Sequence, residues 1–170
     1  MAKRKSVNFE LIQREFQAEP YAILDEMRAQ HEDLAEAQIV LAWREKLKSD
    51  KDGHLVLGKC VKISDLQKEL AEWDFVILLN HETWLFFSAD WKRALMDHEL
   101  CHAAPSLDEE GDVKRDERGR VVWRCRKHDI EEFHDVVQRH GCYKSDLQRF
   151  AEEVLRKRAA PLLEDQVTAT

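Results

Sequence analysis

The sequence lacks any apolar run long enough to cross a membrane as a helix. Apolar runs such as residues 75–79 and 84–87 are short, whereas a membrane-spanning helix needs about 20 consecutive apolar residues. The first residues also lack a basic segment followed by an apolar one, so no secretion signal is readable. We therefore expect a cytoplasmic protein with no membrane partner.

Cysteine is scarce, and no two cysteines form a CxxC pair. The four are Cys60, Cys101, Cys125 and Cys142. In a chain of 170 residues without a secretion signal, such cysteines are better interpreted as reduced thiols than as a disulfide framework.

Positive charge is not in excess. The chain has 27 Lys and Arg against 34 Asp and Glu, which gives a net charge of −7. Proteins held on nucleic acid by phosphate contacts carry a broad cationic surface, so a nucleic-acid partner is not expected. The 44% of hydrophobic residues is enough for one core. We expect residues 1–170 to form a single globular domain, with its core at about 9–158 and loose tails at both ends.

The first half of the chain mixes helical and strand patterns. Residues 9–36 have helical spacing with a break at Pro20. Residues 39–43 and 54–63 predict two strands, joined into a hairpin by the turn dipeptide Asp52-Gly53. Ser64 and Gln67 then form a capping box that opens a short helix to about Trp73.

The second half adds one buried strand and further helices. Residues 74–80 predict the strand, and Ser88 caps a helix that runs to about His102. Asp129 is placed to cap a helix ending before Gly141, and Ser145 opens the last helix, to about Arg158. The order of these elements predicts an α+β fold, with a small mixed or antiparallel sheet packed against the helix that ends at His102.

That helix carries the one motif with recognisable chemistry. Residues 98–102 read His-Glu-Leu-Cys-His, which matches HExxH. His98 and His102 are four residues apart, so both imidazoles lie on one helix face and can bind one Zn²⁺. Glu99 can accept a proton from a water molecule that the metal activates. Cys101, between the two ligands, points away from the metal-facing side and is expected to be a small buried residue.

The third ligand is sought downstream, in residues 127–134. His128 is the first choice, because imidazole is the commonest zinc ligand and a residue just before a helix can point inward. Glu132 is the alternative, since a carboxylate can also bind zinc. A capping box between Asp129 and Glu132 would explain both residues without any metal.

The sequence resembles the phage metallopeptidase family over about residues 39–150. The likeness lies in residues 74–77 with Trp84, residues 94–102 around the motif, and residues 127–133 with 139–141. The resemblance implies a zincin-like fold and a peptidase activity, and it supports His98, Glu99 and His102 directly. A looser likeness connects the chain to SprT-like and ImmA-like peptidases, whose substrates are not carried over.

Two functions are open at this point. The first is a zinc-dependent metallopeptidase that cleaves a protein or peptide substrate with Glu99 as general base. The second is a zinc-stabilised protein-binding module without catalysis, which would have a closed metal site with four protein ligands. Substrate, specificity and oligomeric state cannot be read from the residues.

Overall fold

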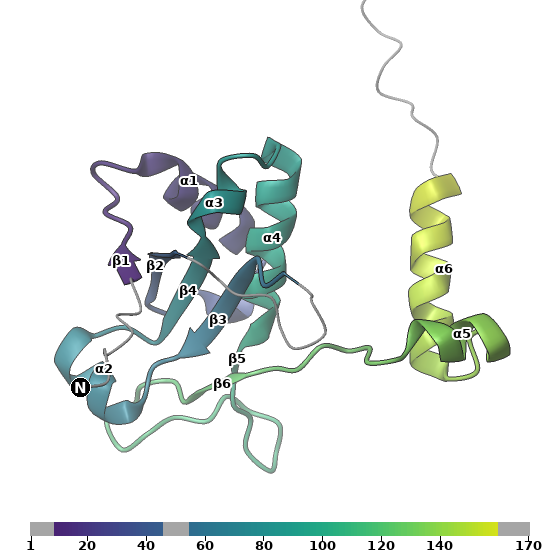
Figure 1. Ribbon diagram of the computed structural model, residues 1–170. Helices are drawn as coiled ribbons and strands as arrows, with labels where there is room; N and C mark the ends of the chain where they lie inside the picture. Colours follow the sequence, from purple (N-terminus) through teal and green to yellow (C-terminus); the bar gives the residue numbers. More distant parts are fainter. Residues whose placement is uncertain (1–8, 46–54, 160–170) are drawn as a thin grey trace, which may run out of the picture. The chain divides into compact units, whose positions relative to one another are not determined.

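The structure is a computed structural model that describes residues 9–45 and 55–159 (Figure 1). The chain divides into two compact units, Met1–Arg126 and Lys127–Thr170. We describe each unit by itself. The expectation of a single domain over residues 1–170 therefore stays a prediction.

A four-stranded mixed sheet forms the centre of the first unit. Its strands are β1 (Phe9–Leu11), β2 (Ile39–Arg44), β3 (Gly58–Lys62) and β4 (Phe75–Asn80), in the order β1-β2-β4-β3. β2 and β4 are parallel, with Leu41 opposite Ile77, and the two outer strands are antiparallel to their neighbours. The predicted α+β class with a small mixed sheet is confirmed.

The predicted hairpin between residues 39–43 and 54–63 is wrong. β2 does not pair with β3, because β4 lies between them, and the turn dipeptide Asp52-Gly53 lies outside the described residues. β4 has the more apolar sequence, with Phe75, Ile77 and Leu79 completely buried. A central position buries both faces of such a strand, and β3, which has two lysines, takes the edge.

The segment before β2 is less helical than predicted. Residues 9–36 form β1, the helix α1 (Ala18–Arg28) and the 3₁₀ helix η1 (Glu32–Leu34). Pro20 lies in the first turn of α1, where the backbone N–H has no intrahelical partner to lose. It therefore belongs to the start of a helix and does not break one.

One helix directly precedes β4 in the sequence and two helices directly follow it. The capping box of Ser64 and Gln67 is confirmed at the start of α2 (Asp65–Ala71). Asn80 caps the single turn α3 (His81–Trp84), and Ser88 caps α4 (Ala89–His102), as predicted. α4 packs against α1 and runs along β3, so the motif helix lies at the edge of the sheet.

A second small sheet follows α4 directly. β5 (Ala103–Pro105) pairs with β6 (Trp123–Cys125). The chain beyond β6 is joined back to the motif helix, because the Arg126 N–H donates to the His102 carbonyl at 2.7 Å. This bond fixes the first residue after β6 at the end of α4.

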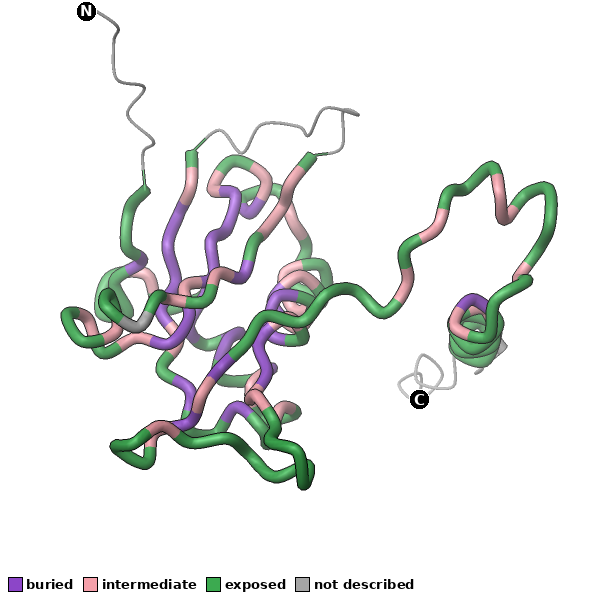
Figure 2. Tube along the Cα trace, turned by 90° about the horizontal axis from the view of Figure 1, so that it is seen from below, coloured by how far each residue is buried: buried purple, intermediate pink, exposed green. Residues whose placement is uncertain are grey.

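The buried residues of the first unit form one core. In Figure 2 they follow the strands and the inner sides of the helices. Phe75 packs edge-to-face on Trp123, and Trp84 packs in the same way on Trp43, with ring centroids 5.8 and 6.0 Å apart. No helix of the described residues is both long and apolar enough to cross a membrane.

The second unit is a pair of helices, α5 (His134–His140) and α6 (Ser145–Ala159). Gly141 ends α5 with φ of +66°, as predicted. The predicted cap at Asp129 is wrong, because α5 begins five residues later with Phe133 in the capping position. The Glu132 carboxylate pairs with Lys144 at 2.6 Å.

Candidate metal centre

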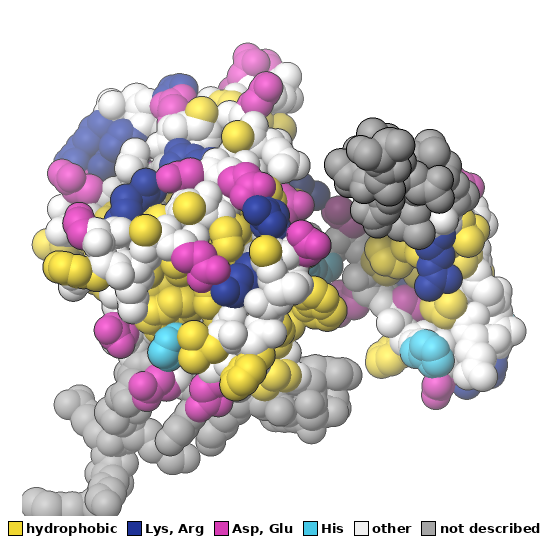
Figure 3. All heavy atoms as spheres, turned by 90° about the horizontal axis from the view of Figure 1, so that it is seen from above, with side chains coloured by type: hydrophobic (Ala, Val, Ile, Leu, Met, Phe, Trp, Pro, Cys, Tyr) yellow, Lys and Arg dark blue, Asp and Glu magenta, His cyan; other side chains and the backbone are white. Residues whose placement is uncertain are grey.

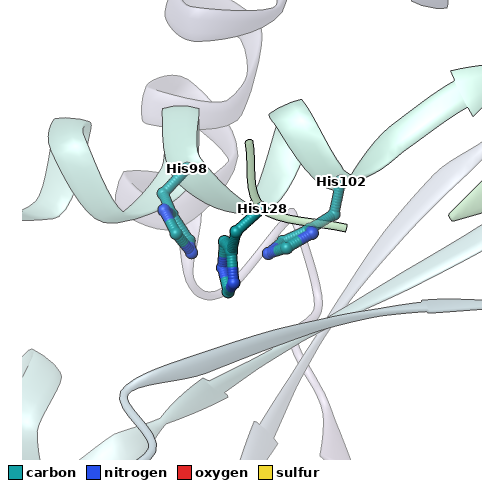
Figure 4. Close-up of side chains that lie close together, drawn as sticks. All are labelled: His98, His102 and His128. Atoms are coloured by element: carbon teal, nitrogen blue, oxygen red, sulfur yellow. The ribbon is translucent and has the colours of Figure 1, made fainter. Parts of the chain in front are cut away.

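The end of α4 presents the two histidines of the motif on one face. Their ring centroids lie 5.0 Å apart and the ring planes are inclined by 84°. Both rings point to the same side of the helix (Figure 4). The His98 side chain is exposed and that of His102 is half-buried, so solvent can reach both. The spacing of one helical turn produces this arrangement.

A backbone carbonyl orients the His102 ring. The His102 Nδ1 lies 2.9 Å from the Arg126 carbonyl oxygen, which can only accept a hydrogen bond. Nδ1 therefore carries the ring hydrogen and donates it, which leaves the lone pair of a neutral ring on Nε2. A histidine that binds a metal usually has such a partner on its second nitrogen.

His128 stands two residues after Arg126 and brings a third imidazole. One ring nitrogen from each of His98, His102 and His128 lies within 4.8 Å of the other two. The three rings converge below α4 in Figure 4. Three imidazoles in this arrangement could hold one metal ion.

Glu132, the alternative third ligand, is engaged elsewhere. Its carboxylate accepts hydrogen bonds from the Tyr143 hydroxyl and the Phe133 N–H, and forms the ion pair with Lys144. The Lys144 ammonium, followed by the Tyr143 hydroxyl, lowers the pKa of Glu132 to about 2. All four residues belong to the second unit, and Glu132 is not in the group with His98 and His102.

Glu99 is buried between α4 and β3. Its side chain is 4% exposed, and burial raises the pKa of its carboxyl group, although a hydrogen bond from the Cys60 backbone N–H opposes the rise. Gly58 makes the close approach possible, since a Cβ built there would lie 2.6 Å from Glu99 Oε1. The carboxylate is thus held against the edge strand next to the histidines.

Three groups that build this site were not predicted from the sequence. They are the Cys60 N–H, the Arg126 carbonyl and the missing side chain of Gly58. The first two are backbone groups, which every residue carries, so no residue type signals them. The expectation that Cys101 is buried is also wrong, because its side chain is exposed.

A separate hollow of about 500 Å³ in the first unit lies away from the histidines. Its lining includes Glu69, Arg118 and Arg120, and Glu69 forms ion pairs with both arginines at 2.6 and 2.8 Å. Because these charges satisfy one another, we assign no ligand to this hollow.

Comparison with known proteins gives one match. The model of the family described as "Putative phage metallopeptidase" matches residues 10–155, which include the whole motif and His128. No curated protein and no solved structure matches the chain. The mixed α+β architecture described above is consistent with a zincin-like metallopeptidase fold.

Proposed function

The chain belongs to the phage metallopeptidase family, and from that premise we propose that it is a zinc-dependent peptidase with Glu99 as its general base. The observation that carries the proposal is the group of three imidazole nitrogens within 4.8 Å of one another, next in sequence to a buried glutamate. The group contains imidazoles alone, so nothing in it favours a closed site with a thiolate.

The donor set fits zinc. His98, His102 and His128 would hold the ion through neutral imidazole nitrogens, and the bond to Arg126 already sets the His102 ring in the form that exposes Nε2. Three protein ligands leave one of four positions open, which is the pattern of catalytic zinc sites. Because Glu132 is paired with Lys144, we propose His128 as the third ligand.

The role of general base goes to Glu99 because it follows His98 directly and its carboxyl group lies against β3 at the end of the motif helix. When bound, zinc polarises a carbonyl group and lowers the pKa of water to about 7. With zinc in place, the Glu99 carboxylate would accept the proton of the water and pass it to the leaving amine. The Cys60 N–H uses one acceptor position of the carboxylate and keeps it in place, and a carboxylate has further positions for the water.

The edge of β3 supports an extended peptide as the substrate. The Asn80 N–H donates to Leu57 O and the Ile63 N–H to Asp74 O, so odd-numbered residues of β3 bond to β4. By alternation, the even-numbered residues turn their backbone groups away from the sheet. The Cys60 N–H is one of these groups and already donates to Glu99, so an extended peptide that adds to this edge would lie next to the Glu99 carboxylate.

The test is the cleavage of a peptide library prepared from a bacterial proteome, read by mass spectrometry. We expect zinc-loaded wild-type protein to cleave and Glu99→Gln to lose about 10²- to 10⁴-fold in rate while it keeps its zinc. His98→Ala should lose both zinc and cleavage. Glu82→Gln is the matched control, because Glu82 follows His81 in the same way but lies outside the group.

Either of two results would overturn the proposal. One is a Glu99→Gln variant that cleaves as fast as the wild type. The other is a wild-type protein that binds zinc yet cleaves no library peptide faster than Glu99→Gln does.

A further inference from the structure

A second group of ligand-type side chains lies on another face of α4. His31 Nε2 is 2.7 Å from Asp97 Oδ1. One ligand atom each from His31, Asp97 and Cys101 lies within 4.8 Å of the other two. All three residues belong to the first unit, and none of them is in the group of His98, His102 and His128.

The two groups share one helix because their spacings are offset by one residue. Asp97 and Cys101 are four residues apart, as are His98 and His102. Successive helical residues are rotated by about 100°, so the pairs lie on neighbouring faces. One face carries the candidate catalytic histidines, while the other faces the connection between α1 and η1, where His31 stands.

The turn that carries His31 is well bonded. The His31 N–H donates to Arg28 O at 2.9 Å, and the Leu34 N–H donates to His31 O at 3.0 Å. The Arg28 guanidinium donates to the carbonyls of Leu34, Ala35 and Ala37. His31 is thus presented to α4 by a fixed turn, and its own side chain is only 15% exposed.

The donor chemistry of this group differs from that of the first. An imidazole, a carboxylate and a thiolate together suit zinc and similar borderline-soft divalent cations. Calcium and magnesium prefer oxygen ligands alone. The exposed Cys101 thiol is accessible to a metal ion in solution.

We propose that His31, Asp97 and Cys101 form a second zinc site, which joins the turn between α1 and η1 to the motif helix. Binding replaces the hydrogen bond between His31 and Asp97 by two bonds to one cation, and the Cys101 thiol releases its proton to solvent as it becomes a ligand. The three residues leave the fourth position of a zinc ion to water, and the site does not depend on the peptidase activity proposed above.

Titration of the metal-free full-length chain with Co²⁺ tests the proposal. Cobalt bound by a thiolate gives a sulfur-to-metal charge-transfer band, whereas the three-histidine centre has no sulfur donor. We expect wild type to bind about two equivalents with this band, and Cys101→Ser about one equivalent without it. Cys142→Ser, which removes a thiol of the second unit, should behave as the wild type.

The double variant His98→Ala/His102→Ala separates the two sites. We expect it to bind about one equivalent and to keep the thiolate band. Adding His31→Ala to the double variant should weaken that band. If the double variant does not fold, the comparison of wild type with Cys101→Ser still decides, since serine is a small change at an exposed position. The proposal is wrong if Cys101→Ser keeps the band or binds as much cobalt as the wild type.

Failure of the peptidase proposal would look different. In that case the wild type would bind one equivalent of cobalt with the thiolate band, and the double variant would bind the same amount with the same band. The three-histidine centre would then bind no metal, while the second site would be retained.

Discussion

The unit up to Arg126 buries Phe75, Trp84 and Met96 almost completely, whereas α6 in the second unit leaves Phe150 and Leu155 more than half exposed. Figure 2 shows the same contrast, with buried residues concentrated in the first unit. Among the described residues from Lys127 onward, Leu147 alone is buried. Apolar burial is the main source of folding free energy, so the first unit supplies the stable scaffold of the molecule.

The first unit also exposes some apolar side chains. Leu85, Phe86 and Trp91 lie between α3 and the first turn of α4 and are exposed. Figure 3, viewed from above, shows apolar side chains gathered among charged ones on this unit. The difference between the units therefore lies in what they bury and not in a lack of exposed apolar groups.

Truncating one phenylalanine in each unit gives the largest expected contrast. Phe75→Ala removes a ring that is fully buried against Trp123 and should cost about 3–5 kcal/mol of the free energy of unfolding. Phe150→Ala removes an exposed ring and should change it by less than about 0.5 kcal/mol.

Urea denaturation followed by tryptophan fluorescence measures the first unit, since all five tryptophans precede Arg126, and circular dichroism of the same samples measures the helices of the second unit. If Phe75→Ala does not fold, Phe75→Leu should show a smaller loss in the same direction. Equal costs for Phe75→Ala and Phe150→Ala would contradict the contrast between the units.

One glycine in each unit sharpens the comparison further. Gly58→Ala places a Cβ 2.6 Å from Glu99 Oε1, so the buried carboxylate must move away from the Cys60 N–H. We expect a cost of about 1–3 kcal/mol together with a loss of cleavage, because Glu99 is then misplaced.

Gly141→Ala is the matched control. Its Cβ would meet nothing within 4 Å, but the positive φ of +66° strains any other residue by about 1–3 kcal/mol. The expected result is weaker helix α5 with cleavage retained, measured by circular dichroism and by the peptide library. Full activity of Gly58→Ala would show that Glu99 does not need its present position.

Local patterns predicted the elements of this chain better than their arrangement. The strand at 74–80, the helix from Ser88 to His102 and the capping box of Ser64 each depend on neighbouring residues, and each is confirmed. The strand order and the cap at Asp129 depend on distant partners. Glu132 pairs with Lys144, twelve residues away, and no local pattern signals that choice.

The candidate site divides in the same way. The spacing of His98 and His102 follows from helical geometry, and the structure places their rings side by side. The groups that hold this site are a backbone N–H at Cys60, a carbonyl at Arg126 and the absent side chain of Gly58. Backbone groups are the same in every residue, so only the folded chain reveals them. That these histidines bind zinc stays a prediction.

Two glutamates, one in each unit, respond to pH in opposite directions. Burial raises the pKa of Glu99 above its ordinary value of 4.5. In the metal-free protein its contribution to stability is therefore present below pH 4.5 and is lost as the pH rises through its raised pKa. Lys144 lowers the pKa of Glu132 to about 2. The contribution of Glu132 to stability is therefore present above pH 4.5 and is lost as the pH falls toward 2.

Carbon-detected NMR of the carboxyl groups tests this smallest effect directly. We expect Glu132 to titrate near 2 in the wild type, as its shifted pKa requires, and closer to its ordinary 4.5 in Lys144→Met, because the ammonium is the main cause of the shift. Glu131→Gln, at the exposed neighbouring position, should leave the Glu132 titration unchanged. The effect on unfolding is small, since ion pairs near solvent contribute little to stability. A wild-type Glu132 that titrates at 4.5 would mean that the pair does not form.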